Sequence, residues 1–349
     1  MTPLARKLLR WYAAQKRSLP WRADPQPYAV WVAEVMAQQT RLDSMLPYYR
    51  RWLRHYPTTR ALARSSEQDV LALWEGLGYY NRARNLRRAA QMIMSEFGGK
   101  LPSRIEDLRR LPGIGAYTAG AIASLAFKVD TPAVDGNAVR VLARLFDIAL
   151  PIGSRAAQKQ FWSLATEHLP AGRAADYNQA LMDLGAQVCT PRQPRCGDCP
   201  LQAECRATAL GNQEHRPVKV KVKPLPRRHY AAAVIQQGGQ VLVLQRPARG
   251  LLAQMWEFPN APGTKATLRK TLQQNFGLSM PLDHRLGKFQ HSYSHFSVRL
   301  QVFHQALNGE RPQVQTERKH KWLPISQLDR LPMGKLDRRI AGALRAGIE

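Results

Sequence analysis

All four cysteines of this 349-residue chain lie in one short stretch, with the spacing C-x6-C-x2-C-x5-C. A compact loop of this kind can bring four sulfurs to one point, and four thiolates can hold either zinc or an iron–sulfur cluster. A single C-x2-C flanked by two looser cysteines favours iron–sulfur, with zinc, disulfides or free thiols as alternatives. The candidate ligands are Cys189, Cys196, Cys199 and Cys205. We expect the site to be structural, because four thiolates leave no open ligand position.

The chain is strongly basic, with 52 Lys and Arg against 25 Asp and Glu and a formal net charge of +27. Both halves share the positive excess, which favours a surface that contacts nucleic acid over a purely solubilising role. Hydrophobic residues make up 44% of the sequence, which is enough to build a core. No apolar run is long enough to span a bilayer, so we expect a cytoplasmic, nucleoid-associated protein without membrane contact.

The composition changes near residue 208, which predicts two domains. Residues 1–208 contain amphipathic stretches broken by Pro and Gly, which are typical of an all-helical domain. Residues 209–228 are basic and proline-punctuated, as in HRPVKVKVKPLPRR, and indicate a linker. Residues 229–349 predict an α+β domain, with a hairpin in YAAAVIQQGGQVLVLQ, a helix in TKATLRKTLQQNFG and a strand in HFSVRLQVFHQAL.

Residues 105–126, IEDLRRLPGIGAYTAGAIASLA, predict two helices joined by a tight turn. Gly113 and Gly115 permit this turn and a close approach of the backbone. Amides at the start of the second helix can then donate to a phosphate oxygen. This is the helix-hairpin-helix arrangement, which grips the DNA backbone without reading the base sequence. The alternative is an ordinary helix corner with no ligand.

Two carboxylates are candidates for acid chemistry. Glu34 lies in the apolar helix AVWVAEVMAQQT, where burial would raise its pKa and keep it protonated, unless it faces solvent. Asp135 precedes the helix in PAVDGNAVRVLARLF, where it would act as an N-cap. The helix dipole and the amide hydrogen bonds there should keep it ionised. A neutral acid and an anion form the pair that glycosidic-bond cleavage requires.

These segments together resemble the MutY adenine DNA glycosylases. The motifs WVAEVMAQQT, LGYYNRARNL, LPGIGAYTAGAI and VDGNAVRVLARLF precede the cysteine cluster in the order of that family, and the resemblance covers essentially the whole chain. It implies a multi-domain protein of the superfamily that also contains endonuclease III. An all-α helix-hairpin-helix glycosylase domain with a 4Fe–4S cluster loop at residues 189–205 is followed by an α+β Nudix-like domain. The implied substrate is adenine mispaired with 8-oxoguanine or guanine in duplex DNA, and we expect a monomer.

The resemblance also implies catalytic roles. Glu34 matches the general acid that protonates the flipped adenine, plausibly at N7, and later helps to position water. Asp135 matches the carboxylate that stabilises the oxocarbenium ion or forms a transient covalent adduct with the sugar. Tyr117 and Asn137 match residues that support these two carboxylates and close the pocket.

Further positions match residues that contact bases. Arg22, in LPWR, and Gln179, in YNQALMDLG, match positions near the adenine edge. Gln39 and Tyr79 match side chains inserted into the base stack. Extruding a base costs a few kcal/mol of stacking and pairing, so inserted side chains help to hold the opened duplex. For Tyr79 the alternative is a core aromatic.

The residue at position 117 separates two chemistries. In the endonuclease III branch, the residue two positions beyond the last hairpin glycine is a lysine, whose amine forms a Schiff base with the sugar and cleaves the strand. Here Tyr117 stands two positions after Gly115, and a phenol cannot form an imine. We therefore expect a monofunctional glycosylase that leaves the abasic strand intact.

The C-terminal domain resembles the Nudix fold but lacks the signature of a hydrolase. Working Nudix hydrolases bind divalent metal through carboxylates of a REUxEExGU helix. In an alignment that ends at Gly277-Leu278, the ionisable positions hold Lys270, Thr271, Gln274 and Asn275. We therefore expect no metal site and no pyrophosphate hydrolysis in this domain.

Recognition of an oxidised guanine remains open to this domain. Tyr293, Ser294 and His295 match the FSH-type loop of the family, with Tyr where Phe is common. Ser294 would then donate to or accept from the altered edge of 8-oxoguanine. Without the resemblance, His295 would be read as a solvent-facing strand residue.

Three functions follow as hypotheses. The first is a monofunctional adenine glycosylase, and the second a bifunctional pyrimidine-damage glycosylase and lyase of the endonuclease III type. The third is a non-catalytic protein that binds lesions. Tyr117 and the C-terminal domain oppose the second hypothesis, and the retained carboxylates Glu34 and Asp135 oppose the third.

Overall fold

The computed structural model describes residues 1–220 and 224–347. The chain divides into two compact units, one made of Met1–Arg64 and Asn85–Val222 and the other of Ser65–Arg84 and Lys223–Glu349. The second unit thus takes a helical segment from the region that we assigned to the N-terminal domain. No described helix combines the length and apolar character that a membrane crossing requires.

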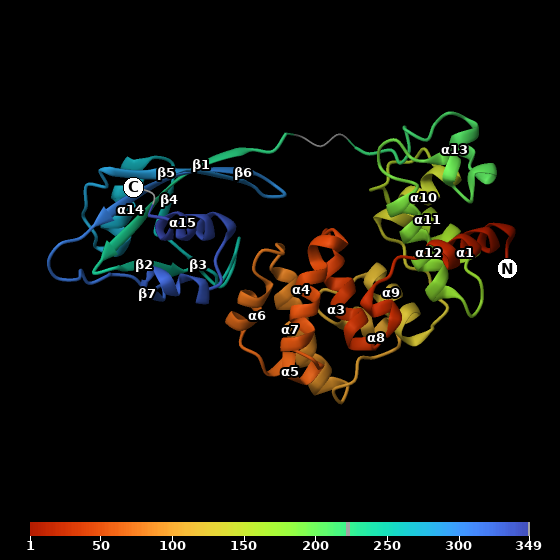
Figure 1. Cartoon of the computed structure of the whole chain (residues 1–349), viewed down its shortest axis with the longest axis horizontal. Coiled ribbons are helices and arrows are strands. Elements are labelled where there is room, and N and C mark those ends of the chain that lie inside the picture. Colours follow the sequence, from red (N-terminus) through yellow and green to blue (C-terminus); the bar gives the residue numbers. More distant parts are fainter. Residues whose placement is uncertain (221–223, 348–349) are drawn as a thin grey trace. The chain divides into compact units, whose positions relative to one another are not determined.

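Residues 1–208 form helices joined by loops, as predicted, and Figure 1 shows them in red through green. Their bounds are α1 (Pro3–Gln15), α2 (Pro20–Ala23), α3 (Pro27–Ala37), α4 (Leu42–His55), α5 (Thr59–Arg64), α6 (Glu67–Trp74), α7 (Asn81–Glu96), α8 (Ile105–Arg110), α9 (Ala116–Phe127), α10 (Gly136–Leu145), α11 (Arg155–Glu167), α12 (Ala174–Gln187) and α13 (Arg206–Ala209), with 3-10 turns η1 (Cys196–Asp198) and η2 (Gln202–Glu204).

Helices α1, α10, α11 and α12 share one apolar core in the first unit. Leu8, Leu142, Phe161 and Tyr177 are fully buried in it. Apolar residues recur along each helix at a spacing of three or four, so one face of each helix is covered while the other stays polar. The cysteine loop lies against the same core. The packing therefore ties this loop to the helix that follows Asp135.

The predicted helix-hairpin-helix consists of α8, a turn at residues 111–115 and α9. Gly113 has a φ of +83°, and a Cβ built on it would lie 2.8 Å from Cβ of Asn85, so the turn requires glycine there. Gly115 differs from the expectation of a strained turn residue, because it is the extended N-cap of α9 with φ −90°. A Cβ built on Gly115 would meet open space, and no side chain caps the helix.

The second unit is built on a seven-stranded sheet with the order β3-β2-β1-β6-β5, while β4 pairs with β1 and β7 pairs with β2. The bounds are β1 (Arg227–Gln237), β2 (Gln240–Gln245), β3 (Trp256–Glu257), β4 (Asn260–Pro262), β5 (His284–Ser292), β6 (Ser297–Ala306) and β7 (His320–Pro324), with helices α14 (Lys265–Phe276) and α15 (Lys335–Arg345) and the 3-10 helix η3 (Ile325–Arg330). Strands β1 and β6 run parallel and the other pairs are antiparallel, which makes the sheet mixed.

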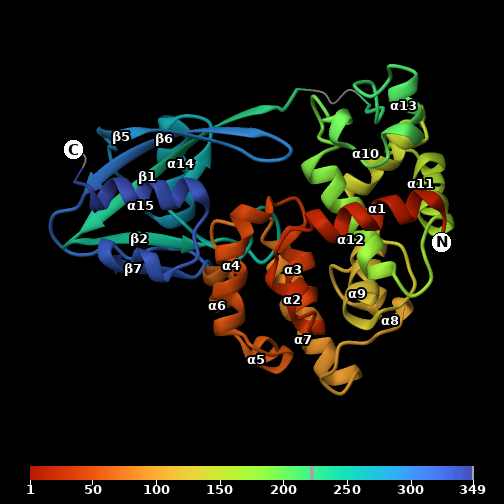
Figure 2. The same cartoon turned by 45° about the vertical axis from the view of Figure 1, so that its right-hand side comes forward.

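Both faces of this sheet are covered by helices. Ala231, Ala233 and Ile235 of β1 belong to the core under α14, while Ala232 and Val234 belong to the core under α15. Successive side chains of a strand point to opposite faces, so a continuous apolar run is buried on both sides. Figure 2 shows α14 and α15 with the strands between them.

The predicted elements of the C-terminal domain are confirmed. The hairpin joins β1 to β2 through the pair Gln237 and Gln240, and the predicted helix and strand are α14 and β6. Strand β1 begins at Arg227, one residue before the expected end of the linker. Residues 221–223 of that linker lie outside the described part.

Candidate active site

Glu34 is a buried carboxyl on α3. Its relative exposure is 6%, so the alternative of a solvent-facing residue is wrong. Burial raises its pKa to about 7, as expected for a carboxyl removed from water. The phenol of Tyr117, on α9, donates to Oε2 of Glu34 at 2.6 Å and partly opposes this shift. The side chain is therefore a neutral acid over much of the range below neutral pH.

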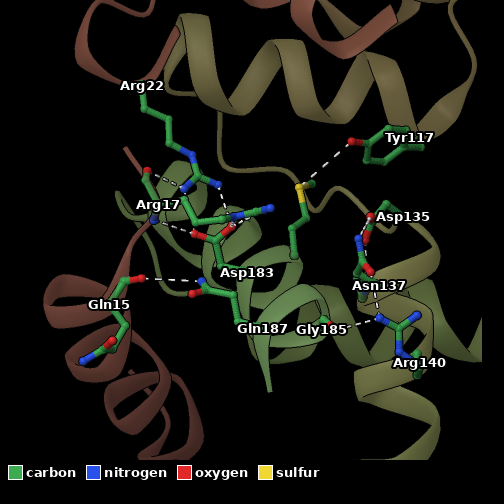
Figure 3. Close-up of polar contacts among 12 residues, drawn as sticks. Gln15, Arg17, Arg22, Tyr117, Asp135, Asn137, Arg140, Asp183, Gly185 and Gln187 are labelled. Atoms are coloured by element: carbon green, nitrogen blue, oxygen red, sulfur yellow. Dashed lines mark hydrogen bonds and ion pairs between the residues drawn. The ribbon is translucent and has the colours of Figure 1, made fainter. Parts of the chain in front are cut away.

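Tyr117 remains a phenol. Burial raises its pKa well above the usual value, and the neighbouring Glu34 and Asp135 raise it further. The hydroxyl also lies 4.0 Å from Sδ of Met182 on α12, a contact drawn in Figure 3. Small residues of α9 allow this close packing, since a Cβ on Gly120 would lie 2.3 Å from the carbonyl oxygen of Pro132.

Asp135 is the N-cap of α10, as predicted. Its Oδ1 accepts from the Ala138 amide at 2.7 Å, and its Oδ2 accepts from Nδ2 of Asn137 at 2.8 Å. We expected these bonds and the helix dipole to favour the ionised form and so to lower its pKa. Burial instead raises its pKa, while the Ala138 and Asn137 hydrogen bonds and the charge of Arg140 oppose the rise. Asp135 also raises the pKa of Glu34, so the two carboxyls act on one another.

A chain of contacts leads from Asp135 to the cysteine loop. Arg140 donates to Oδ1 of Asn137 at 2.8 Å, to the Gly185 carbonyl at 2.6 Å and to the Cys189 carbonyl at 2.7 Å. Gly185 must be small, because a Cβ there would lie 2.6 Å from Cβ of Asn137. Figure 3 shows Asn137, Arg140 and Gly185 in this arrangement. Asn137, which donates to Asp135, is thus bonded to Arg140, and Arg140 is bonded to the backbone of α12 and of Cys189.

Of the two residues predicted near the adenine edge, Gln179 is buried and Arg22 is half-buried. Arg22 is in α2, and both terminal nitrogens of its guanidinium contact Asp183. Gln179, on α12, donates to the Ala175 carbonyl at 3.0 Å. Nε of Arg22 and Oε1 of Gln179 have no hydrogen-bond partner among the described residues. One donor and one acceptor are thus left for a ligand.

Gln39 and Tyr79, which we predicted to enter the base stack, share an unusual backbone. Their φ values are +54° and +49°, in the left-handed region that non-glycine residues rarely adopt. Gln39 is exposed after α3, in the first unit. Tyr79 belongs to the second unit, where its side chain is 46% exposed, so the alternative of a core aromatic is wrong.

Tyr293, Ser294 and His295 form the turn between β5 and β6. The Tyr293 amide donates to the Phe296 carbonyl at 2.8 Å, and the two rings pack with centroids 5.1 Å apart. Ser294 and His295 are exposed. Oγ of Ser294 lies 2.9 Å from the hydroxyl of Tyr79, so the second unit brings two predicted contact residues together.

The four cysteines are not joined in disulfides and line one cavity, together with Arg144. Arg144 is fully buried, and its Nη1 lies 3.3 Å from Sγ of Cys189, a donor that suits a thiolate. No three His, Cys, Asp or Glu side chains of the described residues are grouped to hold a single metal ion. Four thiols around one cavity fit an iron–sulfur cluster, in which each iron takes one protein thiolate.

Sequence reasoning missed three charged residues of the first unit, Arg17, Arg140 and Asp183. Asp183 stands in the apolar segment ALMDLG, four residues after Gln179, and a carboxylate on a buried helix face is the signal that could have found it. Arg140 follows Asn137 by three residues and so lies on the same face of α10. Arg17 gave no signal, because its partner is 166 residues away.

Family models match both halves of the chain. Residues 32–166 match the HhH-GPD superfamily of base excision DNA repair proteins, and residues 230–343 match the NUDIX domain. A human adenine DNA glycosylase is 36% identical over 384 residues, an alignment that covers 93% of this chain and 70% of the relative. The chain belongs to the adenine DNA glycosylases. A Buchnera aphidicola (strain Sg) member of the family is 33% identical over 295 residues, with 84% of each chain covered.

Solved structures agree on the fold of the helical part of this adenine DNA glycosylase. A thermostable thymine-DNA glycosylase matches with a TM-score of 0.53 and 27% identity, over 59% of this chain and 95% of that one. Endonuclease III in a non-covalent complex with DNA matches with a TM-score of 0.52 and 21% identity, over 60% and 94%. The predicted fold class, a helix-hairpin-helix glycosylase domain followed by a Nudix-like domain, is confirmed.

Proposed function

We propose that this adenine DNA glycosylase excises adenine opposite 8-oxoguanine or guanine in duplex DNA, by a hydrolytic mechanism that leaves the strand intact. The observation that supports this most directly is the pair formed by buried Glu34 and half-buried Asp135. Glu34 has a pKa of about 7 and a phenol as its hydrogen-bond partner, while Asp135 is held by an amide and by Asn137. The first can deliver a proton, and the second can face a developing cation.

Glu34 starts the reaction by transferring its proton to adenine, at N7. Protonation makes the base a better leaving group, so the bond between its N9 and C1′ of the sugar breaks and both electrons go to the base. The positive charge then spreads over C1′ and the ring oxygen, where the carboxylate of Asp135 stabilises it. Water adds to C1′ and returns its proton to Glu34, which restores the acid. Tyr117 holds the carboxyl of Glu34 in place through these steps.

Base recognition would use the two polar atoms that lack partners. Nε of Arg22 can donate to a ring nitrogen of the flipped adenine, and Oε1 of Gln179 can accept from its amino group. Leaving such buried groups without partners costs about 1–3 kcal/mol each, so a base that satisfies them is favoured. Gln39 would fill the space that the flipped base leaves in the stack, and Tyr79 would lie next to the lesion.

Grip on the DNA backbone would come from the start of α9. Its first amides have no side-chain cap, and the open space at Gly115 lets a phosphate approach. The net charge of +27 adds a sequence-independent attraction to the duplex. In this role Gly113 shapes the turn and Gly115 gives access.

Recognition of 8-oxoguanine would fall to the second unit. Tyr79 and Ser294 offer two hydroxyls 2.9 Å apart on an exposed surface, and Tyr293 and His295 flank Ser294. A hydroxyl can both donate and accept, which suits a base edge whose donor and acceptor pattern differs from that of guanine. The positions of the Nudix metal ligands hold no carboxylate, so this domain would bind and not hydrolyse.

The cofactor would be a 4Fe–4S cluster held by Cys189, Cys196, Cys199 and Cys205. Such a cluster supplies redox capacity and a rigid anionic centre when it is bound. The proton transfers of Glu34 and the charge stabilisation by Asp135 need no electron transfer, so the role of the cluster here would be structural. Arg144 and the packing of the loop against the α10–α12 core would keep the four thiols in place.

One assay tests the proposed function and separates it from the alternatives. The protein, purified with its iron, is incubated with duplexes that contain A:8-oxoguanine, A:G or thymine glycol, with and without alkali. We expect adenine release and strand cleavage only after alkali, and little trapping by borohydride because Tyr117 cannot form an imine. Cleavage without alkali would support the lyase alternative. Binding without base release would support a lesion-binding protein and overturn the proposal.

A further inference from the structure

Asp183 is the most completely buried charge next to the active site. It lies on α12, and its side chain has no exposure. The carboxylate accepts from the Arg17 backbone amide at 3.2 Å, from Nε of Arg17 at 2.7 Å and from Nη2 of the same residue. It also accepts from Nη1 and Nη2 of Arg22 at 2.7 and 2.9 Å. One carboxylate thus holds two arginines, as Figure 3 shows.

This arrangement fixes Arg22 in one orientation. Both terminal nitrogens of its guanidinium are used by Asp183, and Nη1 also donates to the Arg17 carbonyl at 3.1 Å. The guanidinium lies over the ring of Tyr12 at 5.7 Å, and the side chain is only 11% exposed. A bidentate fork of this kind has little freedom to turn toward another acceptor.

Glu34 is another carboxyl on which the charge of Arg22 acts, and its role as an acid would suffer from an ion pair. The charged groups that act on Glu34 are Asp135 from the α10 side and Arg22 from α2, beside the phenol of Tyr117 from α9. Arg22 has the smallest effect on the pKa of Glu34. Among the described residues, no Lys, Arg or His forms an ion pair with Glu34. An arginine paired directly with Glu34 would favour the carboxylate and remove the proton that the reaction needs.

We propose that Asp183 is a positioning residue that holds Arg22 away from Glu34, and so keeps the catalytic carboxyl without a cationic partner. The inference rests on the proposed role of Glu34 as the acid. Asp183 gives Arg22 an ion-pair partner, so that Arg22 does not pair with Glu34. Gln179, one turn earlier on the same helix, is presented from the same scaffold, so α12 would supply both a base contact and this restraint.

The test compares variants by the ionisation of Glu34 itself. In Asp183→Asn, Arg22 loses its charged partner and should turn to Glu34, whose pKa should then fall by about one unit or more. Adding Arg22→Gln to Asp183→Asn should reverse that fall, because no arginine is left to pair. The readout is a ¹³C carboxyl titration, assigned by Glu34→Gln, alongside the pH dependence of single-turnover adenine release. Asp176→Asn, an exposed residue of the same helix paired with Arg173, is the matched control and should change neither readout.

Several outcomes decide the proposal. A Glu34 pKa in Asp183→Asn that equals or exceeds that of the wild type would overturn it, as would a fall that Arg22→Gln does not reverse, since a merely structural role predicts no such rescue. If Asp183→Asn does not fold, Arg17→Gln/Asp183→Asn leaves one unpaired arginine instead of two and gives the same comparison. The titration needs no substrate, so absence of adenine release by the wild type would refute the proposed function alone.

Discussion

The two units each bury a carboxyl whose pKa is about 7, yet only one of the two has the partners of a catalyst. Burial is the main cause of the raised pKa of Glu34 in the helical unit and of Asp337 in the sheet unit. In each case the charge of a second carboxyl raises the pKa further. Glu34 accepts from the Tyr117 phenol beside Asp135. Asp337 accepts from the Phe258 amide at 3.0 Å and lies near Glu257. A raised pKa therefore marks burial, and the surrounding groups decide whether it serves chemistry.

The carboxyls next to these two residues, Asp135 and Glu257, also differ in their partners. Glu257 is paired with Arg246 and with Arg318, the latter at 2.5 Å, so two guanidinium groups compensate its charge. Asp135 has an amide and the Asn137 side chain as its hydrogen-bond donors, and no guanidinium is bonded to it among the described residues. An anion held by dipoles keeps more of its field for a substrate cation than one paired with arginine. Uncharged donors thus hold Asp135, whereas two arginines hold Glu257.

The strongest test of this comparison removes each proton in turn. Glu34→Gln should lower the single-turnover rate of adenine release by about 10²–10⁴-fold, the usual share of a general acid, while DNA binding persists. Asp337→Asn should leave that rate within a few-fold of the wild type, because its proton lies in the other unit. Rates are measured at saturating enzyme on an A:8-oxoguanine duplex. Retained turnover in Glu34→Gln would remove its assignment as the acid.

The sequence could single out Glu34, because it is the charged residue in the apolar run of α3, but its burial was settled by the structure. It could also place Asp135 at a helix start, from the helical pattern that follows it. It could not balance the burial of Asp135 against its hydrogen bonds, which depend on α12 packing against α10 at Gly185. Nor could it pair Asp183 with Arg17 and Arg22, since that contact joins segments more than 160 residues apart.

The division into units was equally hidden from the sequence. Residues 65–84 have the helical pattern of their neighbours, yet their contacts lie with the sheet unit. Gln68 accepts from Nε1 of Trp256 at 3.0 Å, and Glu75 accepts from the Met333 amide at 2.9 Å. These polar groups stand seven residues apart on one face of the α6 segment. Local pattern predicts the element but not the partner that it packs against.

A smaller effect is expected from the hydrogen bond that distinguishes Glu34 from Asp337. The Tyr117 phenol lowers the pKa of Glu34, so Tyr117→Phe should raise it. A bond worth about 1 kcal/mol corresponds to about 0.5–1 pH unit. Because the protonated acid is the active form, the rate falls as pH rises through this pKa, and the descending limb should move to higher pH. The pH dependence of kcat/KM measures it, and a limb that moves to lower pH would contradict the assigned role of the phenol.

The smallest expected effect concerns stability and isolates Asp337. Its folded pKa of about 7 lies above the unfolded value of about 3.9, so the folded state holds the proton more tightly. Below the unfolded pKa both states are protonated and nothing changes. As pH rises from about 4 to 7, the unfolded state ionises first and the residue becomes increasingly destabilising, fully so above the folded pKa. Asp337→Asn keeps an acceptor for the Phe258 amide but cannot ionise, so its Tm should exceed that of the wild type by a few degrees at pH 8 and approach it at pH 5. Thermal unfolding at both pH values measures this, with the exposed Asp329→Asn as the control. If the difference in Tm between Asp337→Asn and the wild type were the same at pH 5 and pH 8, Asp337 would not carry the buried proton that Glu34 is compared with.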